Sequence, residues 1–253
     1  MKFGAIIIGD EILSGKRQDK HLAKAIELLG ARGLELAWGL YLGDDPELIT
    51  ATLKRTLASG DVAFSFGGIG ATPDDHTRAC AARAAGVELR LHPQAEAEIR
   101  ARFADNPQGV TPQRLAMGEF PAGSEIIPNP YNRIPGFVVR EHWFVPGFPQ
   151  MAWPMLEWVL DTKYRELFDR DRWAEASVIV YLPESTIAPL MEEINARYKG
   201  LKAFSLPSMG ANATDASHRH IELGVRGAPA EVEPAIADIR KGIQALGGRF
   251  EER

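Results

Sequence analysis

The sequence predicts an α/β protein in which a large domain with a mainly parallel sheet is followed by a small α+β domain. As far as Ala85, strand-like apolar runs alternate with helix-like segments, and this order joins parallel strands through right-handed crossovers. A different order of shorter strands and two helices begins at Ala174. Each of the first three strands also ends in an acidic turn, namely Asp10-Glu11, Asp44-Asp45 and Asp74-Asp75.

Composition and charge narrow the class of protein. The 253 residues are 45% hydrophobic and 25% charged, as in a soluble globular protein that can hold one large and one small domain. The net charge of −5 argues against a nucleic-acid or anionic-membrane surface. The single cysteine, Cys80, excludes an intramolecular disulfide and is expected to pack. Because no apolar run reaches transmembrane length and Met1–Ile8 is too short for a signal peptide, we expect a cytoplasmic protein without a membrane partner.

The first half of the chain alternates strands and helices in a regular order. Residues 3–8 and 62–66 are short apolar runs typical of buried parallel strands, and a third strand-like run spans 34–42. Apolar residues from Leu22 to Leu29 recur at helical spacing, and Pro46 behind Asp45 marks another helix start. A further helix is expected over 78–85.

Between His92 and Leu160 the same domain is expected to continue. Pro93 and Pro112 open two helices, 137–140 and 143–145 form a hairpin, and a helix spans 151–160. The intervening turn, Pro146-Gly147-Phe148-Pro149, fixes the backbone direction at another ligand-facing strand end. We therefore expect the large domain over 1–160, a charged linker over 161–173 and the small domain over 174–253.

The small domain is expected to be ferredoxin-like or KH-like. Strands are predicted over 177–182, 203–206 and 219–225, the second ending at Pro207, with helices over 184–198 and 231–246. Residues 210–213 lack the second glycine of a Gly-x-x-Gly loop, so no nucleic-acid partner is expected. His218 and His220 share a strand face, but no third metal ligand is in view. The domain is expected to mediate homo-oligomer formation or to cover the active site.

A glycine-rich loop follows the strand 62–66 and opens the next helix. Its glycines at 67, 68 and 70 allow tight turns and close approach of a ligand to backbone N–H groups. The following Asp74 and Asp75 are suited to a divalent cation beside a bound phosphate. The alternative is a strand-to-helix turn with acidic capping residues. The spacing matches neither a dinucleotide-binding fingerprint nor, at Gly9–Arg17, a P-loop.

The acidic turns are expected to meet. Because the carboxyl ends of parallel strands share one edge of a sheet, the turns at Asp10-Glu11, Asp44-Asp45 and Asp74-Asp75 converge there. This convergence favours a ligand site more strongly than the glycine loop alone does.

The motifs of the large domain resemble a known family. The matching sequence elements are Gly9-Asp10-Glu11-Ile12-Leu13-x-Gly15, Leu42-Gly43-Asp44, Gly67-Gly68-Ile69-Gly70-x-Thr72-x-Asp74-Asp75-x-Thr77, Asn129-Pro130, Pro135-Gly136-Phe137 and Pro146-Gly147-x-Pro149. They resemble the molybdopterin-binding-like domain of the competence/damage-inducible protein A (CinA) family. The same domain is similar to bacterial molybdopterin biosynthesis proteins and to the N-terminal domain of eukaryotic FAD synthases.

The resemblance implies a three-layer α/β fold and one of two chemistries. In the competence-type branch it implies a divalent-metal-dependent pyrophosphatase acting on ADP-ribose or a related dinucleotide such as FAD. In the cofactor-biosynthesis branch it implies molybdopterin binding or transfer without hydrolysis. The functional acids of that branch match Asp44 and Asp75, and the glycine loop holds phosphate. The ligand is in either case a small nucleotide or pterin.

These considerations define the expected site. Asp44 and Asp75 are the expected catalytic acids, with Glu11 as general base or, alternatively, a capping acid. Mg²⁺, Mn²⁺ or Co²⁺ is expected on Asp44, Asp74 and Asp75. Lys16, Arg17 or Arg133 can neutralise the leaving phosphate or are solvated surface charges. The expected phosphate- and ligand-binding residues are Gly9, Asp10, Gly67, Gly68, Ile69, Gly70, Ala71, Thr72, Thr77, Pro146 and Gly147.

The sequence departs from the family pattern near the expected ligand edge. Residues 16–21 replace an Asn-Thr-Asn-type run, residues 131–134 replace Gly-Thr-Ala, and Ala71 replaces a proline. These differences leave the identity of the substrate open. Phe148 can stack on a base or belong to the core. Because the chain ends at Arg253 without the nicotinamide mononucleotide deamidase domain of many members, no deamidation is expected.

Overall fold

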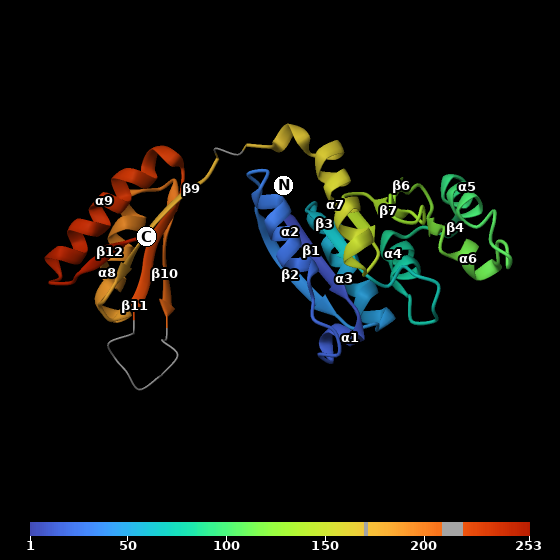
Figure 1. Ribbon diagram of the computed structural model, residues 1–253, viewed down its shortest axis with the longest axis horizontal. Helices are drawn as coiled ribbons and strands as arrows, with labels where there is room; N and C mark the ends of the chain where they lie inside the picture. The colour runs from blue at the N-terminus through green and yellow to red at the C-terminus, as the bar shows by residue number, and fades with distance from the viewer. Residues whose placement is uncertain (170–171, 209–219) are drawn as a thin grey trace. The chain divides into compact units, whose positions relative to one another are not determined.

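The computed structural model describes residues 1–169, 172–208 and 220–253 (Figure 1). The chain divides into two compact units, Met1–Phe168 and Asp169–Arg253. The division falls inside the segment 161–173 that the sequence marks as a linker. Residues 210–213 and His218, considered above for nucleic-acid and metal binding, lie outside the described residues. No helix in the described part of the chain combines the length and apolar character needed to cross a membrane.

A six-stranded sheet forms the centre of the first unit. Four neighbouring strands, β2, β1, β3 and β8, run parallel, and the last two are antiparallel to their neighbours. The sheet is therefore mainly parallel, as predicted. In sheet order the strands are β2 (Leu36–Leu42), β1 (Phe3–Ile8), β3 (Val62–Phe66), β8 (His142–Val145), β7 (Gly136–Val139) and β6 (Glu125–Ile127).

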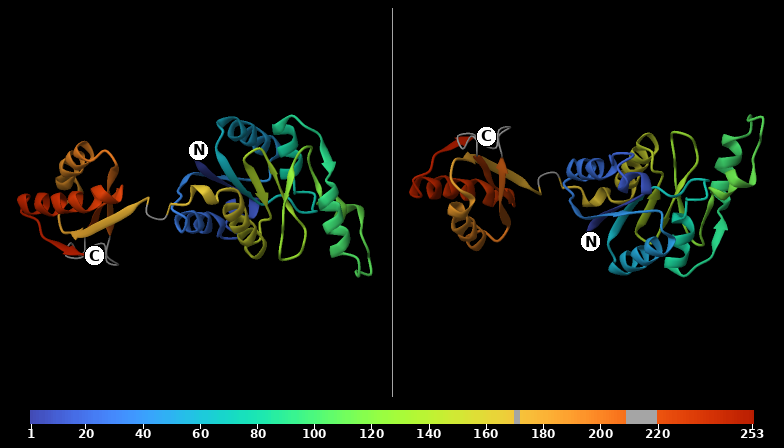
Figure 2. Two further views of the ribbon diagram at one scale, coloured as in Figure 1. Left: turned by 90° about the horizontal axis from the view of Figure 1, so that it is seen from above. Right: turned by 90° about the horizontal axis from the view of Figure 1, so that it is seen from below.

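Helices cover both faces of this sheet, which confirms the three-layer fold (Figure 2). On one face α2 (His21–Gly30) and α7 (Pro149–Lys163) contact each other and bury side chains of β1 such as Ile7. On the other face α3 (Pro46–Ser59) and α4 (Thr77–Ala85) pack together over Ile6 and Ile8. Because β1 is covered on both sides, all six of its residues are buried, which explains its continuous apolar run. Cys80 of α4 is fully buried in the second layer, as expected.

The start of α3 shows how the sequence sets an element boundary. One carboxylate oxygen of Asp45 accepts hydrogen bonds from the N–H groups of Glu47 (2.8 Å) and Leu48 (3.0 Å). Pro46 occupies the first helical position, where no N–H is required. The helix therefore begins directly after the β2 turn, and this fixes Asp44 at the end of β2.

Several elements of the first unit differ from the expectation. Residues Asp10–Leu13 form a short helix, α1, where only a turn was expected. Two three-residue strands, β4 (Leu89–Leu91) and β5 (Glu119–Pro121), pair with each other beside α5 (Pro93–Arg102) and α6 (Pro112–Ala116), all grouped in green in Figure 1. Helix α7 is longer than the predicted 151–160 at both ends, and the 3₁₀ helix η1 (Arg165–Leu167) follows it.

The second unit has the ferredoxin-like order of the two alternatives considered. Its elements follow the order strand, helix, strand, strand, helix, strand around an antiparallel sheet ordered β10-β11-β9-β12. The prediction that Pro207 ends a strand is wrong, because Pro207 lies within β10, opposite Ile221. β10 is an edge strand, where a missing N–H is tolerated. The elements are β9 (Ala174–Val180), α8 (Glu184–Arg197), β10 (Leu201–Ser208), β11 (His220–Gly227), α9 (Pro229–Ala245) and β12 (Phe250–Glu252).

Candidate ligand-binding site

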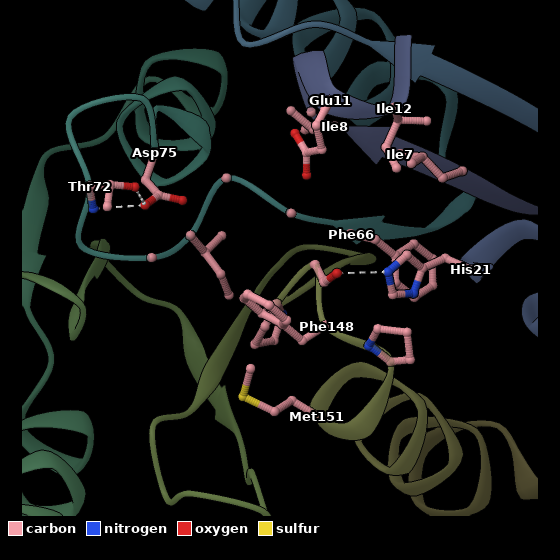
Figure 3. A pocket seen from close by; sticks show the side chains of 18 of the residues that line it. Ile7, Ile8, Glu11, Ile12, His21, Phe66, Thr72, Asp75, Phe148 and Met151 are labelled. Atoms are coloured by element: carbon pink, nitrogen blue, oxygen red, sulfur yellow. Dashed lines mark hydrogen bonds between the residues drawn. The ribbon is translucent and has the colours of Figure 1, made fainter. Parts of the chain in front are cut away.

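A cavity of about 860 Å³ opens at the carboxyl ends of the parallel strands (Figure 3). The strand register brings these ends together, because Ile8 pairs with Leu42, Ile7 with Phe66 and Phe66 with Val145. The segments that follow these strands, with parts of neighbouring loops, therefore surround one volume. They are residues 7–12, 17–21, 44, 66–75, 117, 129–135 and 146–151, not all of which face the cavity.

The glycine loop lies tightly against the sheet and α4. Gly67 has φ +102°, and a Cβ there would come within 2.3 Å of the Ile8 carbonyl oxygen. Gly68 has φ +68°, and a Cβ there would come within 2.1 Å of the Thr77 Oγ1. Only glycine satisfies both the backbone angle and the space at these two positions. The glycines thus let the loop backbone form the wall of the cavity.

The backbone donors of this loop are available to a ligand. Among the described residues, no hydrogen-bond acceptor is found for the N–H groups of residues 68–71, whereas the flanking Gly67 and Thr72 N–H groups are both bonded. Gly67 donates to the Val145 carbonyl (3.0 Å), and Thr72 donates to Asp75 Oδ2 (2.8 Å). Four consecutive unpaired donors beside a cavity match an oxyanion such as phosphate.

Asp75 shapes the end of the loop. Its Oδ2 accepts hydrogen bonds from both the N–H (2.8 Å) and the hydroxyl (2.5 Å) of Thr72, as the dashed lines of Figure 3 show. A Cβ on Gly70 would come within 2.6 Å of the same oxygen. One carboxylate oxygen of Asp75 therefore holds the loop closed.

Asp10 and Asp44 connect the ends of β1 and β2. The Asp10 N–H donates to Asp44 Oδ2 (2.9 Å), and the Asp44 N–H donates to Asp10 Oδ1 (3.1 Å). Asp44 faces the cavity, where burial raises the pKa of its carboxyl. The hydrogen bond from the Asp10 N–H lowers that pKa by a smaller amount. The negative charges of Asp10, Glu11 and Asp74 raise that pKa further. The site thus concentrates negative charge that a bound cation would offset.

Most of the predicted site residues meet in this cavity. Asp10 and Thr77 do not line it. Thr77 is fully buried beneath Gly68, whose carbonyl oxygen accepts its N–H (3.0 Å). The ligand roles expected for Asp10 and Thr77 stay predictions, whereas their observed contacts support the loops. The predicted residues that do line the cavity are Gly9, Glu11, Asp44, Gly67, Gly68, Ile69, Gly70, Ala71, Thr72, Asp74, Asp75, Pro146 and Gly147.

Residues 4–165 match the family model described as "probable molybdopterin binding domain". The chain belongs to this family. It is 33% identical over 201 residues to a CinA-like protein of Desulfosudis oleivorans, covering 77% of this chain and 49% of that protein. A CinA-like protein of Citrifermentans bemidjiense is 35% identical over 200 residues, covering 76% of this chain and 47% of its own length. The chain thus spans about half the length of these curated relatives.

Two further proteins are similar to this chain. A protein of Aeropyrum pernix is 29% identical over 256 residues, which cover 98% of this chain and 95% of that protein. The crystal structure of the protein CinA, of unknown function, from Thermoplasma acidophilum superposes with a TM-score of 0.58 at 28% identity. The superposition covers 64% of this chain and 98% of the Thermoplasma acidophilum chain. The family resemblance and the fold class predicted from the sequence are both confirmed.

The segments where this molybdopterin binding domain departs from the family pattern do line the cavity, as expected. Residues 17, 18, 20 and 21 contribute from the first segment, and residues 132 and 134 from the second. Of the three basic residues considered, only Arg17 faces the cavity. Arg133 instead pairs with Glu98, with 2.7 Å between its Nε and the carboxylate. Arg17 is therefore the basic residue of the three that is placed to meet a ligand.

His21 is a cavity residue to which the sequence analysis assigned no role. It is 5% exposed, stacks on Phe66 at a ring separation of 4.7 Å, and places its Nε2 3.1 Å from the Gly147 carbonyl oxygen. Burial lowers the pKa of His21, so the imidazole is neutral and its Nε2–H donates to that carbonyl. The sequence indicated the position of His21 only through segment 16–21, which departs from the family pattern near the expected ligand. This hydrogen bond connects His21 to the turn at 146–149.

The donor atoms in the cavity suit a hard divalent cation. No group of three or more His, Cys, Asp or Glu side chains is arranged to hold a metal within residues 1–169, 172–208 and 220–253. Carboxylates of Asp44, Asp74 and Asp75 nevertheless face the cavity beside the unpaired loop donors. Mg²⁺ commonly takes one or two protein carboxylates and completes its shell with phosphate oxygens and water. The site therefore fits a cation that arrives together with a phosphorylated ligand.

Proposed function

We propose that the protein hydrolyses the diphosphate linkage of ADP-ribose or a related dinucleotide such as FAD, with the help of a divalent cation. The observation that carries this proposal is the juxtaposition of the unpaired N–H groups of residues 68–71 with the carboxylates of Asp44 and Asp75. Backbone donors bind one phosphate, and oxygen ligands hold the cation beside it.

Each residue has a distinct part in this reaction. The loop N–H groups bind and orient a phosphate, and Asp44 and Asp75, with Asp74 nearby, hold Mg²⁺, Mn²⁺ or Co²⁺. A bound cation would stabilise charge on the phosphoryl oxygens and lower the pKa of a water molecule. Glu11 accepts a proton from the attacking water as the bridging P–O bond breaks. With ADP-ribose, one water is consumed and AMP and ribose 5-phosphate are released.

Binding or transfer of a pterin cofactor without hydrolysis is the second candidate. It is favoured by the match of residues 4–165 to the molybdopterin binding domain family. In this function the loop donors would hold the phosphate of molybdopterin, and no water would be activated.

The two functions are separated by a turnover assay. ADP-ribose, FAD, NAD and ATP would each be incubated with the protein and Mg²⁺, Mn²⁺ or Co²⁺, and the products separated by chromatography. We expect cation-dependent release of AMP from ADP-ribose or FAD that is lost in Asp75→Asn. The matched control is Asp45→Asn, since Asp45 caps α3 outside the cavity and asparagine is an equally good cap.

Absence of turnover on every substrate, from protein with an intact thermal unfolding transition, would reject the hydrolase. Saturable binding of a phosphorylated pterin under the same conditions would then establish the second candidate. Turnover that persists in Asp75→Asn would show that the hydrolysis does not belong to this site.

A further inference from the structure

One side of the cavity is aromatic and is not used by the proposed chemistry. Phe148 lies on the opposite side from Asp75 and Thr72, near Met151 (Figure 3). Phe148 is 52% exposed, so it is not the core residue that the sequence left as an alternative. Aromatic side chains line many ligand pockets, where they stack on the rings of bound molecules.

The backbone that carries Phe148 is held in place. Pro146 and Pro149 restrict the turn, and Pro149 is the first residue of α7. The Phe148 carbonyl oxygen accepts hydrogen bonds from the N–H groups of Met151 (3.0 Å) and Ala152 (2.9 Å). The Nε2–H of His21, at the start of α2, donates to the adjacent Gly147 carbonyl oxygen. A ligand that contacts the ring therefore meets a preorganised surface and orders little backbone.

Arg17 connects the aromatic side of the cavity to the acidic side. Its guanidinium carbon lies 5.5 Å from the centroid of the Phe148 ring. Its Nη1 lies 3.7 Å from Glu11 Oε1. The guanidinium is planar, so it can stack on a heteroaromatic ring as well as pair with phosphate.

We propose that Phe148 and Arg17 form a stacking site for a planar heteroaromatic ring on the phosphorylated ligand. The ring, adenine or pterin, stacks on Phe148, and its phosphate reaches the N–H groups of residues 68–71. His21 donates a hydrogen bond to the turn that carries Phe148. This inference rests on the phosphate site of the proposed function and adds where the ring of the ligand binds.

The stacking site is tested by calorimetric titration in the presence of Mg²⁺. AMP, neopterin monophosphate and ribose 5-phosphate are the three probes, since the last carries a phosphate without a ring. We expect Phe148→Ala to raise the Kd of the preferred ring-bearing probe about 10-fold and to leave that of ribose 5-phosphate unchanged. Phe148→Trp should restore binding. If AMP loses affinity in Phe148→Ala, the ligand is a nucleotide. If neopterin monophosphate loses affinity, the ligand is a pterin.

The chain offers a matched control at Phe103. This ring is partly exposed, outside the cavity, and also contacted by arginine, with the Arg114 guanidinium 4.2 Å from its centroid. Phe103→Ala should leave all three Kd values unchanged. The stacking site would be overturned if Phe148→Ala weakened the binding of AMP and of ribose 5-phosphate equally. It would also be overturned if the variant bound both ring-bearing probes as tightly as the wild type does.

The titrations, read together with the turnover assay, keep this inference separable from the proposed function. Ring-dependent binding without hydrolysis would reject the hydrolase and support the stacking site. Binding of all three probes with no effect at Phe148 would reject the stacking site alone. Failure of all three probes to bind the folded wild-type protein would reject both.

Discussion

His142, at the start of β8, is a buried histidine with one hydrogen bond. Its Nε2 lies 2.8 Å from Thr56 Oγ1, and that hydroxyl lies 3.1 Å from the Thr52 carbonyl oxygen to which it donates. Nε2 therefore carries the proton, and the buried Nδ1 has no partner among the described residues. Burial, with a smaller effect of the Arg140 charge, lowers the pKa of His142 to about 4. The folded state thus disfavours the charged imidazolium.

This lowered pKa predicts a loss of stability in mild acid. As the pH falls below 6.5 the unfolded chain binds a proton at His142 before the folded chain does, so the free energy of unfolding decreases until about pH 4. The loss from a shift of this size is on the order of 3 kcal/mol. Urea unfolding between pH 7 and 4 would measure it.

His142→Gln is the control for this titration. Glutamine keeps a donor for Thr56 but does not titrate, so the variant should lose less stability over the same pH range. His21, whose pKa is also lowered, contributes equally to both proteins. Identical pH profiles for wild type and variant would contradict the assignment to His142.

At the scale of elements, the glycine loop links β3 to α4 and depends on Gly68. Alanine there would meet both a positive φ of +68° and the Thr77 Oγ1 at 2.1 Å. We expect Gly68→Ala to cost about 1–3 kcal/mol in the free energy of unfolding and to weaken AMP binding at least about 10-fold, because the loop donors must move. Urea unfolding and calorimetry would measure the two effects.

Gly123 provides the matched control for the loop. Its φ is +85°, yet a Cβ there would meet nothing within 4 Å, and it lies outside the cavity. Gly123→Ala should therefore carry the backbone strain alone and leave AMP binding unchanged. If both variants lowered AMP affinity equally, a specific role of the loop geometry at Gly68 would be excluded.

Some helices and strands could be predicted from the sequence alone, and others could not. The strands β1 and β3 and the helix start at Pro46 carry strong local signals, namely continuous apolar runs and a capped proline. β4, β5 and β6 have three residues each and are too short for a periodic pattern. Pro207 was misread because its tolerance depends on the strand being at an edge, which only the sheet order reveals.

The candidate site was predictable to a similar extent. The acidic turns and the glycine loop could be located because parallel strand ends share one edge. The role of His21 could not, since its hydrogen bond joins residues 126 positions apart in the chain. The exposure of Phe148 likewise depends on which segments pack around it. The roles of His21 and Phe148 therefore depend on long-range packing, which local sequence patterns do not reveal.

At the scale of the whole molecule, each unit has its own buried core. Two hydrophobic clusters lie within Met1–Phe168, and a third lies within Asp169–Arg253. In the described part of the chain, no cluster combines residues of both units. A domain with a complete core can fold alone.

We therefore predict that residues 1–168 fold as an isolated fragment. The fragment should show a cooperative thermal transition by circular dichroism and retain the AMP affinity of the full chain within about twofold, or about 0.4 kcal/mol. A non-cooperative transition would contradict independent folding. Cooperative folding with lost AMP binding would show instead that the second unit completes the site, the role the sequence left open beside formation of a homo-oligomer.

The strand order of the first unit has a consequence for protein synthesis. β8 joins the sheet beside β3, and the turn at 146–149 that follows it supplies one wall of the cavity. A nascent chain that has not yet emerged from the ribosome as far as Met151 already holds the glycine loop and its aspartates, but it lacks this wall. A ligand that needs both sides of the cavity can therefore bind the growing chain only after the turn at 146–149 has been synthesised and β8 has paired with β3.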